Sequence, residues 1–411
     1  MAVTVAVVGA GIRGRGYAEW IGAHPDRARV VAVADPNPRR RPAGVEHVFT
    51  DWKDLAARGR IADCVIVATQ DAMHRDPVLA FAAQGYHIMV EKPLAPTESE
   101  CREMVAAALS NDVILAVGHV LRYTPYTRAV RSIVDSGRLG RIVSAQHLEP
   151  VGYWHQAHSF VRGNWRREDE SSFMLMAKSC HDIDWLQHIV GQPIARVSSF
   201  GSLTHFTPEN RPPDAAGRCL DCPPRVESTC AFSAVRFYGS RLRDGRHYWP
   251  LDVVIDDFTP EALHQALREG PYGRCVYACD NDVVDHQVVL LEFADGATAT
   301  FTMTAFTDSE HRKTRLFGTA GALEGDGQTI KVFDFLTNHT EIIDTTAGGS
   351  SAADGHGGGD AGLMDAFIGA VATGDRNLVL SGPAATLNSH LAVFAAEKAR
   401  RTNTVVQLGV A

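Results

Sequence analysis

Residues 5–14 read VAVVGAGIRG, an apolar run that leads into glycines at positions 9, 11 and 14. In this pattern Gly9 allows a tight turn after a strand, Gly11 lets backbone N–H groups approach a pyrophosphate, and Gly14 permits close packing of the following helix. The N-terminus of that helix supplies further N–H donors and the positive end of its dipole. The stretch therefore predicts a strand, a phosphate-binding turn and a helix.

A carboxylate that suits the adenosine ribose follows 21 residues after the third glycine, at Asp35. It can accept bonds from the ribose hydroxyls and would repel a 2′-phosphate, although Arg39 and Arg40 just beyond could neutralise one. We therefore expect NAD as cofactor, with NADP possible, bound by the glycine loop with its Ile12 and Arg13 and by Asp35. The alternative is a glycine-rich turn without a ligand.

The 411 residues exceed one ordinary core and suggest two domains. The first third alternates apolar runs with helical patterns, which predicts a doubly wound parallel sheet of the Rossmann type, ending near residue 120. Later apolar runs alternate with polar residues at 142–148, 197–202, 285–293 and 297–305. We expect an α/β protein with a cofactor domain at 1–120 and an α+β substrate domain at 121–411 that contains an open, mostly antiparallel sheet.

The charge and hydropathy of the chain exclude several classes of partner. The formal net charge is −8 and there is no basic block, which argues against nucleic acid and makes a small neutral ligand easier to accommodate. No apolar run approaches the ~18 residues of a membrane span, and the start of the chain lacks the basic region of a signal peptide. We expect a cytoplasmic protein with no membrane partner.

A second motif, Glu91-Lys92-Pro93, stands at the end of another predicted parallel strand. Proline biases the residue before it toward an extended conformation, so Lys92 should project from the carboxyl end of the sheet. Ligands of α/β proteins bind at that edge. The alternative is a surface lysine in a loop.

The chain resembles the Gfo/Idh/MocA family of oxidoreductases in four motifs that occur in order, GAGIRG (9–14), ATQDAMH (68–74), EKPLAPT (91–97) and SCHDIDWL (179–186). The resemblance implies a nicotinamide cofactor and substrates among sugars, amino sugars and inositols. It also implies an open-sheet substrate domain of the kind that often mediates oligomer contacts. We therefore expect a polyol substrate and a homo-oligomer, either a dimer or a tetramer.

The resemblance also assigns roles to residues. The family lysine is Lys92 and the family histidine before the I-D pair is His181, which makes both catalytic candidates. An imidazole with a pKa near 6.5 suits removal of the proton from a secondary hydroxyl as a hydride leaves its carbon, while Lys92 polarises the same oxygen. By family position Thr69, His74 and Glu91, together with Lys92, are expected beside the nicotinamide or its ribose.

One position departs from the family pattern. Many members carry an aspartate four residues before the histidine, whereas here that position is Ala177 and the next residue is Lys178. If the segment is helical, Lys178 shares one side with His181 and Asp182 and could enter the site. A second ammonium there would lower the pKa of the imidazole and favour its neutral form. Lys178 is therefore a third catalytic candidate, and the alternative is a solvated helix lysine.

Substrate contacts are expected from the stretch GYWHQAHSFVRGNWR at 152–166, because aromatic faces and hydrogen-bond donors suit a hydroxylated ring. The candidates are Trp154, His155, His158, Arg162 and Trp165. The alternative for each of them is a packed aromatic loop.

Cys219, Cys222 and Cys230 lie in a proline-rich excursion. A structural zinc site needs a fourth ligand, for which Cys275, Cys279 or a histidine could serve. Because the spacing is incomplete, we expect no metal and reduced thiols that pack a loop, with zinc as the alternative.

Three functions fit these features. The first is an NAD(P)-dependent dehydrogenase acting on a secondary hydroxyl of a sugar, a sugar derivative or a cyclitol. The second is a redox-neutral epimerase or glycosidase that works through a transient keto-sugar and needs another acid–base group, such as Lys178 or a loop histidine. The third is a dinucleotide- or sugar-sensing regulator. The intact Lys92 and His181 argue against the third, and we expect the first.

Overall fold

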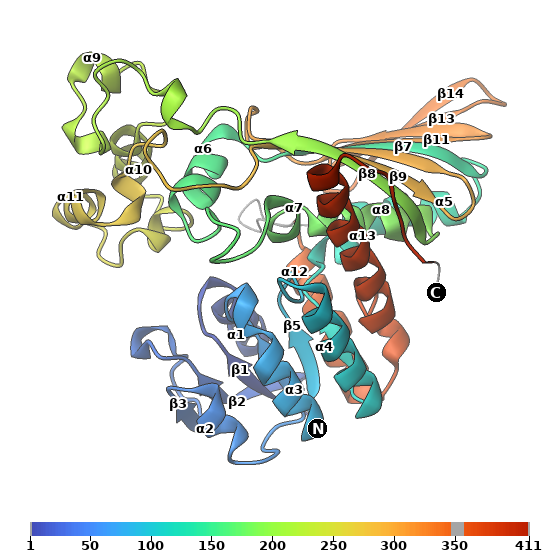
Figure 1. Ribbon diagram of the computed structural model, residues 1–411. Coiled ribbons are helices and arrows are strands. Elements are labelled where there is room, and N and C mark those ends of the chain that lie inside the picture. The colour runs from blue at the N-terminus through green and yellow to red at the C-terminus, as the bar shows by residue number, and fades with distance from the viewer. Residues whose placement is uncertain (1, 347–356, 410–411) are drawn as a thin grey trace.

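Two open sheets organise the chain (Figure 1). The structure is a computed structural model that describes residues 2–346 and 357–409. The first sheet, near the N-terminus, has six parallel strands in the order β3-β2-β1-β4-β5-β6, which confirms the expected Rossmann architecture. Its strands are β1 (Val3–Val8), β2 (Ala28–Ala34), β3 (His47–Phe49), β4 (Cys64–Val67), β5 (His87–Val90) and β6 (Leu115–Val117). The strand order reverses between β1 and β4, and this places a ligand-binding crevice at their carboxyl ends.

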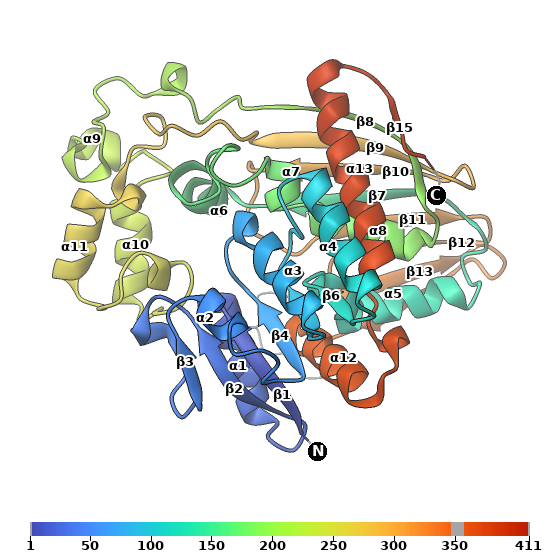
Figure 2. The ribbon, with the colours of Figure 1, turned by 60° about the horizontal axis from the view of Figure 1, so that its bottom comes forward.

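Helices cover both faces of this sheet, and one of them comes from late in the chain (Figure 2). The early helices are α1 (Ile12–Ala23), α2 (Trp52–Ala56), α3 (Arg75–Ala83) and α4 (Glu98–Ser110). Helix α12 (Gly359–Thr373) returns to the sheet and packs beside α1, where its Leu363, Phe367 and Ile368 share a core with Val5 and Tyr17. The cofactor domain is therefore built from both ends of the described chain.

The second sheet has nine strands in the order β14-β13-β12-β11-β7-β10-β9-β8-β15. Only the β7–β10 pair is parallel among these neighbours, so the expected mostly antiparallel sheet is confirmed. Its strands are β7 (Ile142–Pro150), β8 (Ile194–Ser202), β9 (His286–Phe293), β10 (Thr298–Thr304), β11 (Lys313–Gly318), β12 (Gly321–Gly325), β13 (Thr329–Asp334), β14 (His339–Asp344) and β15 (Val406–Gln407).

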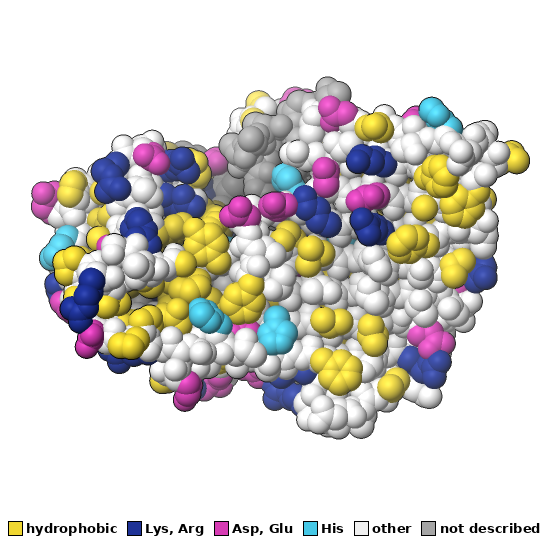
Figure 3. Space-filling view, turned by 90° about the horizontal axis from the view of Figure 1, so that it is seen from above, with side chains coloured by type: hydrophobic (Ala, Val, Ile, Leu, Met, Phe, Trp, Pro, Cys, Tyr) yellow, Lys and Arg dark blue, Asp and Glu magenta, His cyan; other side chains and the backbone are white. Residues whose placement is uncertain are grey.

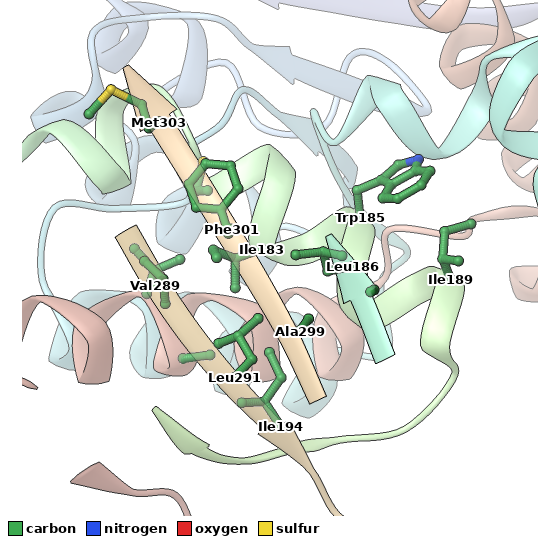
Figure 4. Close-up of a cluster of buried hydrophobic side chains, with 14 of the residues drawn as sticks. Ile183, Trp185, Leu186, Ile189, Ile194, Val289, Leu291, Ala299, Phe301 and Met303 are labelled. Atoms are coloured by element: carbon green, nitrogen blue, oxygen red, sulfur yellow. The ribbon is translucent and has the colours of Figure 1, made fainter. Parts of the chain in front are cut away.

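One face of the second sheet is covered by α5 (Pro125–Asp135), α8 (Cys180–Val190) and α13 (Pro383–Thr402). Helix α8 presents Ile183, Leu186 and Ile189 to a cluster that includes Val289 and Phe301 of the sheet, all buried (Figure 4). Burial of a large apolar side chain stabilises a fold by about 1.5–3 kcal/mol. This packing fixes α8, the helix that carries His181, on the sheet.

The other face of the second sheet carries no helix from the described chain and looks toward the viewer in Figure 3. Strand residues on this face expose large apolar side chains, among them Phe200, Leu290 and Phe317. An antiparallel sheet with alternating side chains can leave one face open in this way.

Helix α13 joins the two domains. Its Phe394 packs against the cores of both. Among the described residues, the segment 376–402 is the one helical stretch whose length and composition would allow it to cross a membrane. In the structure it packs against α4, α8 and β8.

Residues 203–285, between β8 and β9, form what we call the insertion lobe. Its helices are α9 (Pro224–Glu227), α10 (Ala234–Arg243) and α11 (Pro260–Glu269), and its own small core includes Tyr238, Leu251 and Leu267. The lobe lies beside the cofactor domain, where Asp252 faces Arg15 of α1 at 3.7 Å (Figure 2). The lobe therefore contacts the cofactor domain as well as continuing from the second sheet.

Candidate active site

The glycine loop lies between β1 and α1, at the carboxyl edge of the first sheet. Gly9 has a φ of +84°, and a Cβ there would lie 2.7 Å from the carbonyl oxygen of Ala68. A Cβ on Gly14 would lie 1.9 Å from the carbonyl oxygen of Gly9, so this glycine keeps α1 close to β1. At Gly11 a Cβ would meet no described atom within 4 Å, and Ile12 beyond it is exposed. The chain is thus open at the start of α1, where free helix N–H groups suit a pyrophosphate.

Asp35 follows β2 and lies beside this loop. Its carboxylate accepts hydrogen bonds from the backbone N–H groups of Ala10 and Asn37, both at 2.7 Å. The carboxylate is therefore held next to the glycine loop, in the position expected for a ribose partner. Arg39 and Arg40 are exposed on the turn beyond it.

Buried Glu91 and half-buried Arg13 form an ion pair beside the glycine loop, with Arg13 Nε 2.7 Å from Glu91 Oε1. Tyr17 donates its hydroxyl to the same oxygen, and Arg13 also reaches Asp360 of α12. Burial alone would raise the pKa of Glu91, but the Arg13 guanidinium and the hydrogen bond from Tyr17 together outweigh burial, and the pKa is lowered. The backbone N–H of Lys92 donates to Glu91 Oε2 at 3.1 Å, so this pair fixes the segment on which Lys92 stands.

His74 is fully buried and connects two loops at the same edge. Its Nδ1 lies 3.0 Å from the carbonyl oxygen of Pro93, and its Nε2 lies 3.2 Å from that of Thr69. The Thr69 hydroxyl itself donates to the carbonyl oxygen of Met73 at 3.3 Å. His74 therefore holds the loop of Thr69 against the segment that follows Lys92.

Lys92 reaches from the cofactor domain to a residue of the second domain. Its Nζ donates to the carbonyl oxygen of Ala177 at 2.8 Å. Ala177 ends α7 (Met174–Ala177), directly before α8. The ammonium from the cofactor domain thus lies at the start of the helix that carries His181.

His181 is buried, and its ring meets the ring of His119 edge-on, with centroids 5.7 Å apart. The ring of His119 in turn meets that of His390 at 5.4 Å. Burial lowers the pKa of His119 to about 4, although the Asp184 carboxylate opposes this.

Asp184, also on α8, accepts two hydrogen bonds from Arg122 at 2.6 and 2.7 Å. This second aspartate of the motif therefore anchors the helix.

Lys178 precedes α8 and does not continue its face. Its Nζ lies 3.1 Å from Glu149 Oε1 at the end of β7. Arg312 pairs with the same carboxylate and with Asp182, which also accepts from His147. Burial lowers the pKa of Lys178, while Glu149 opposes the shift.

Lys92, Lys178 and His155 lie close enough for their charges to act on one another. The pKa of His155 is lowered well below its usual value by burial, then by Lys178 and Lys92. The structure thus brings together three residues that sequence reasoning selected separately. That reasoning missed Glu149 and Arg312, whose pairing depends on strands far apart in the chain.

Two of the expected substrate residues serve the insertion lobe instead. His158 lies on the π-helix Gln156–Arg162, with its Nδ1 2.6 Å from the hydroxyl of Tyr238. Arg162 donates to the carbonyl oxygens of Arg274 and Phe232, both at 2.8 Å. Both side chains are buried, because the lobe packs on this helix, and this argues against the substrate contacts expected of them.

The two tryptophans of the same stretch are accessible. Trp154 stacks on His155, with centroids 5.7 Å apart, and meets Trp249 of the lobe at 5.3 Å. Trp165 is 37% exposed, and its indole N–H donates to Asp71 of the cofactor domain at 3.2 Å. Trp249 has no motif around it that could have indicated this placement.

The cysteines of the lobe carry free thiols. Cys219 is buried, and its Sγ accepts a hydrogen bond from Arg162 at 3.5 Å. Within the described ranges, no three His, Cys, Asp or Glu side chains gather as metal ligands would.

Comparison with known proteins identifies the family. The model of the Gfo/Idh/MocA family described as an oxidoreductase family with an NAD-binding Rossmann fold matches residues 3–119. The model of its C-terminal alpha/beta domain matches residues 131–408. The chain belongs to this family. As a Gfo/Idh/MocA oxidoreductase it combines an NAD-binding domain, at the glycine loop described above, with a second domain that carries Lys178 and His181.

Several Gfo/Idh/MocA relatives act on sugars or cyclitols. The chain is 28% identical over 208 residues to 2,7-anhydro-N-acetylneuraminate hydratase of Escherichia coli K12, a match that covers 50% of this chain and 55% of the relative. It is 30% identical over 207 residues to inositol 2-dehydrogenase of Rubrobacter xylanophilus, covering 49% of this chain and 56% of the relative. The chain thus spans about half the length of these curated relatives.

A solved levoglucosan dehydrogenase, in complex with NADH and levoglucosan, superposes with a TM-score of 0.70. The two chains are 18% identical, and the superposition covers 100% of each. This likeness extends the shared fold over both domains.

Proposed function

We propose that this protein is an NAD-dependent dehydrogenase that oxidises a secondary hydroxyl of a sugar, a sugar derivative or a cyclitol. The observation that carries the proposal is the reach of Lys92 from the cofactor domain to the start of α8, 2.8 Å from the Ala177 carbonyl oxygen. That contact brings an ammonium from the carboxyl edge of the NAD-binding sheet to the start of the helix that carries His181. The preference for NAD over NADP rests on the buried Asp35 carboxylate.

Each residue has a defined task in this reaction. NAD bound at the glycine loop and Asp35 supplies the acceptor for a hydride. Lys92 donates a hydrogen bond to the oxygen of the reacting hydroxyl and stabilises the negative charge that develops there. His181 accepts the hydroxyl proton. The Glu91–Arg13 ion pair holds the backbone of Lys92 in place throughout.

A redox-neutral reaction is the second candidate, because one observation favours it. Lys178 lies with Lys92 in one electrostatic environment, and burial lowers its pKa toward the range in which an amine exchanges protons. Glu149 beside it is a ready proton partner. Such a second acid–base pair would let the enzyme eliminate or invert at a carbon next to a transient ketone. The hydratase among the relatives supports this alternative.

The deciding experiment follows the cofactor. The protein is purified, its bound NAD(H) is measured after denaturation, and reduced cofactor is followed by absorbance with added NAD and a panel of sugars, glycosides and inositols. Net dehydrogenation predicts many turnovers of reduced cofactor, abolished in Lys92→Met and retained in Lys398→Met, an exposed lysine of α13. Product formed while reduced cofactor stays below one equivalent would establish the redox-neutral reaction instead. An absence of both would contradict the proposal.

A further inference from the structure

Arg241 of α10 is a half-buried arginine that no described carboxylate neutralises. Its guanidinium lies over the rings of Trp154 and Phe237, 4.8 and 4.3 Å from their centroids. Its Nε is buried and has no hydrogen-bond partner within the described chain. Other arginines of the lobe differ: Arg236 faces Glu227, and Arg246 faces Asp244.

This environment satisfies the faces of the guanidinium and leaves its edge unsatisfied. Aromatic rings interact with the planar faces of a guanidinium, whereas the N–H donors point outward in its plane. Burial lowers the pKa of Arg241, and Arg246 adds to the shift, but a guanidinium keeps its proton at any pH a protein survives. A buried donor without a partner is costly, and a carboxylate matches the guanidinium edge with two parallel hydrogen bonds.

Arg241 is also connected to the proposed reacting groups through a chain of neighbouring side chains. Trp154, which it covers, stacks on His155, and His155 responds to the charges of Lys178 and Lys92. Trp249 lies 5.3 Å from Trp154 and extends the aromatic surface on the lobe side. Half-exposed aromatic faces of this kind suit the apolar faces of sugar rings.

We propose that Arg241 binds a carboxylate carried by the substrate away from the carbon that reacts, and that the substrate is therefore an acidic sugar, a uronate or a related sugar acid. In this arrangement Lys92 and His181 act at one end of the substrate, the Trp154 face supports its ring, and Arg241 holds its acidic end. The proposal rests on the proposed function for the position of the reacting carbon.

The test compares matched acidic and neutral ligands on the full-length protein. The probes are D-glucuronate with D-glucose, D-galacturonate with D-galactose, and methyl β-D-glucuronide with methyl β-D-glucoside. Calorimetry on the protein loaded with NADH gives Kd for each member, and reduced-cofactor absorbance with NAD gives kcat/KM. We expect at least one acid to bind about tenfold to a hundredfold more tightly than its neutral partner, the range of a charge-assisted bond.

Arg241→Met keeps an apolar stem over the rings and should bring this acid-to-neutral ratio close to one, while Arg241→Lys should keep part of it. Arg243→Met, an exposed arginine at the end of the same helix, is the matched control and should keep the full ratio. Circular dichroism and the Tm report whether each variant is folded. No acid preference in the unaltered protein, or a ratio that Arg241→Met leaves intact, would overturn the proposal. So would a loss of NADH affinity in Arg241→Met without a change in that ratio, since the anion at Arg241 would then be the pyrophosphate.

The two proposals can fail separately. Turnover of neutral sugars without any preference for acids removes the acidic substrate and leaves the dehydrogenase. Selective binding of acids without any formation of reduced cofactor would support the carboxylate site and contradict net dehydrogenation.

Discussion

Replacement of Arg122 by methionine should destabilise the protein through the charge it leaves behind. Arg122 follows β6 and makes two hydrogen bonds to Asp184 on α8, at 2.6 and 2.7 Å. The side chains are 5% and 0% exposed. Removing one partner of a buried ion pair costs about 3–5 kcal/mol, because the remaining charge is left without compensation. Ser389 still donates to Asp184 at 2.8 Å, so we expect a loss near the lower end, about 3 kcal/mol.

The effect should depend on pH in a defined direction. In the unaltered protein burial raises the pKa of Asp184, but Arg122, with smaller contributions from His119 and Ser389, brings it well below its usual value. The pair therefore stabilises the fold above about pH 4, and this stabilisation is lost as the pH falls further. Without Arg122, burial raises the pKa of Asp184 above its unfolded value. Protonation at lower pH then neutralises the unpaired Asp184 carboxylate. The difference in free energy of unfolding between the unaltered protein and Arg122→Met should therefore narrow from pH 8 to pH 5.

Urea unfolding followed by circular dichroism at several pH values measures this. The double variant Arg122→Met with Asp184→Leu removes both charges and should recover at least half of the loss. A loss under about 1 kcal/mol at pH 7, or a double variant no more stable than Arg122→Met, would refute the assignment of a buried ion pair.

Four further expectations follow from the structure. Lys178→Met should lower kcat/KM about a hundredfold and alter the alkaline limb of its pH profile if the amine exchanges protons, and an unchanged profile would contradict that role. Gly11→Ala, whose Cβ enters open space, should weaken NADH binding in a fluorescence titration with little change in Tm, whereas Gly14→Ala should lower Tm through its 1.9 Å contact. Leu290→Glu on the open sheet face should shift a homo-oligomer toward monomer in size-exclusion chromatography, and no shift would exclude this face as the interface. Burial lowers the pKa of four histidines to about 3 or 4. The free energy of unfolding should therefore fall by about 1.4 kcal/mol per pH unit for each histidine as the pH drops from about 6.5 to 4. A free energy of unfolding that stays constant over this range would contradict their burial. The four are His119, His158, His188 and His390.

The parts of the site that depend on local backbone could be predicted from the sequence. The roles of Gly9 and Gly14 follow from a short strand, a turn and a helix, and the structure shows the close contacts that exclude a side chain at each. The projection of Lys92 from the carboxyl edge likewise needs only its strand and the proline after it.

The parts that depend on distant segments could not be predicted. His158 and Arg162 have the hydrogen-bond donors of a sugar site, yet these donors bind residues of the insertion lobe instead. Nothing in residues 152–166 indicates that the lobe packs there. Lys178 lies before α8 because the helix begins at Cys180, a shift of two residues that redirects its ammonium to Glu149. Ser179 has a non-helical backbone (φ −102°, ψ 10°), and tertiary packing can override helix propensity at such a position.

Because α12 comes late in the chain but packs on the first sheet, the cofactor domain can complete its core only after most of the protein has been synthesised. Until residues 359–373 have left the ribosome, the core around Val5 and Val7 has α1 packed against it but lacks α12. The nascent cofactor domain therefore has all six strands but lacks one covering helix while most of the second domain is made, a period in which chaperones and aggregation compete for its exposed apolar surface. A fragment that stops near residue 120 would carry every NAD-binding motif and still lack the helix that completes its core.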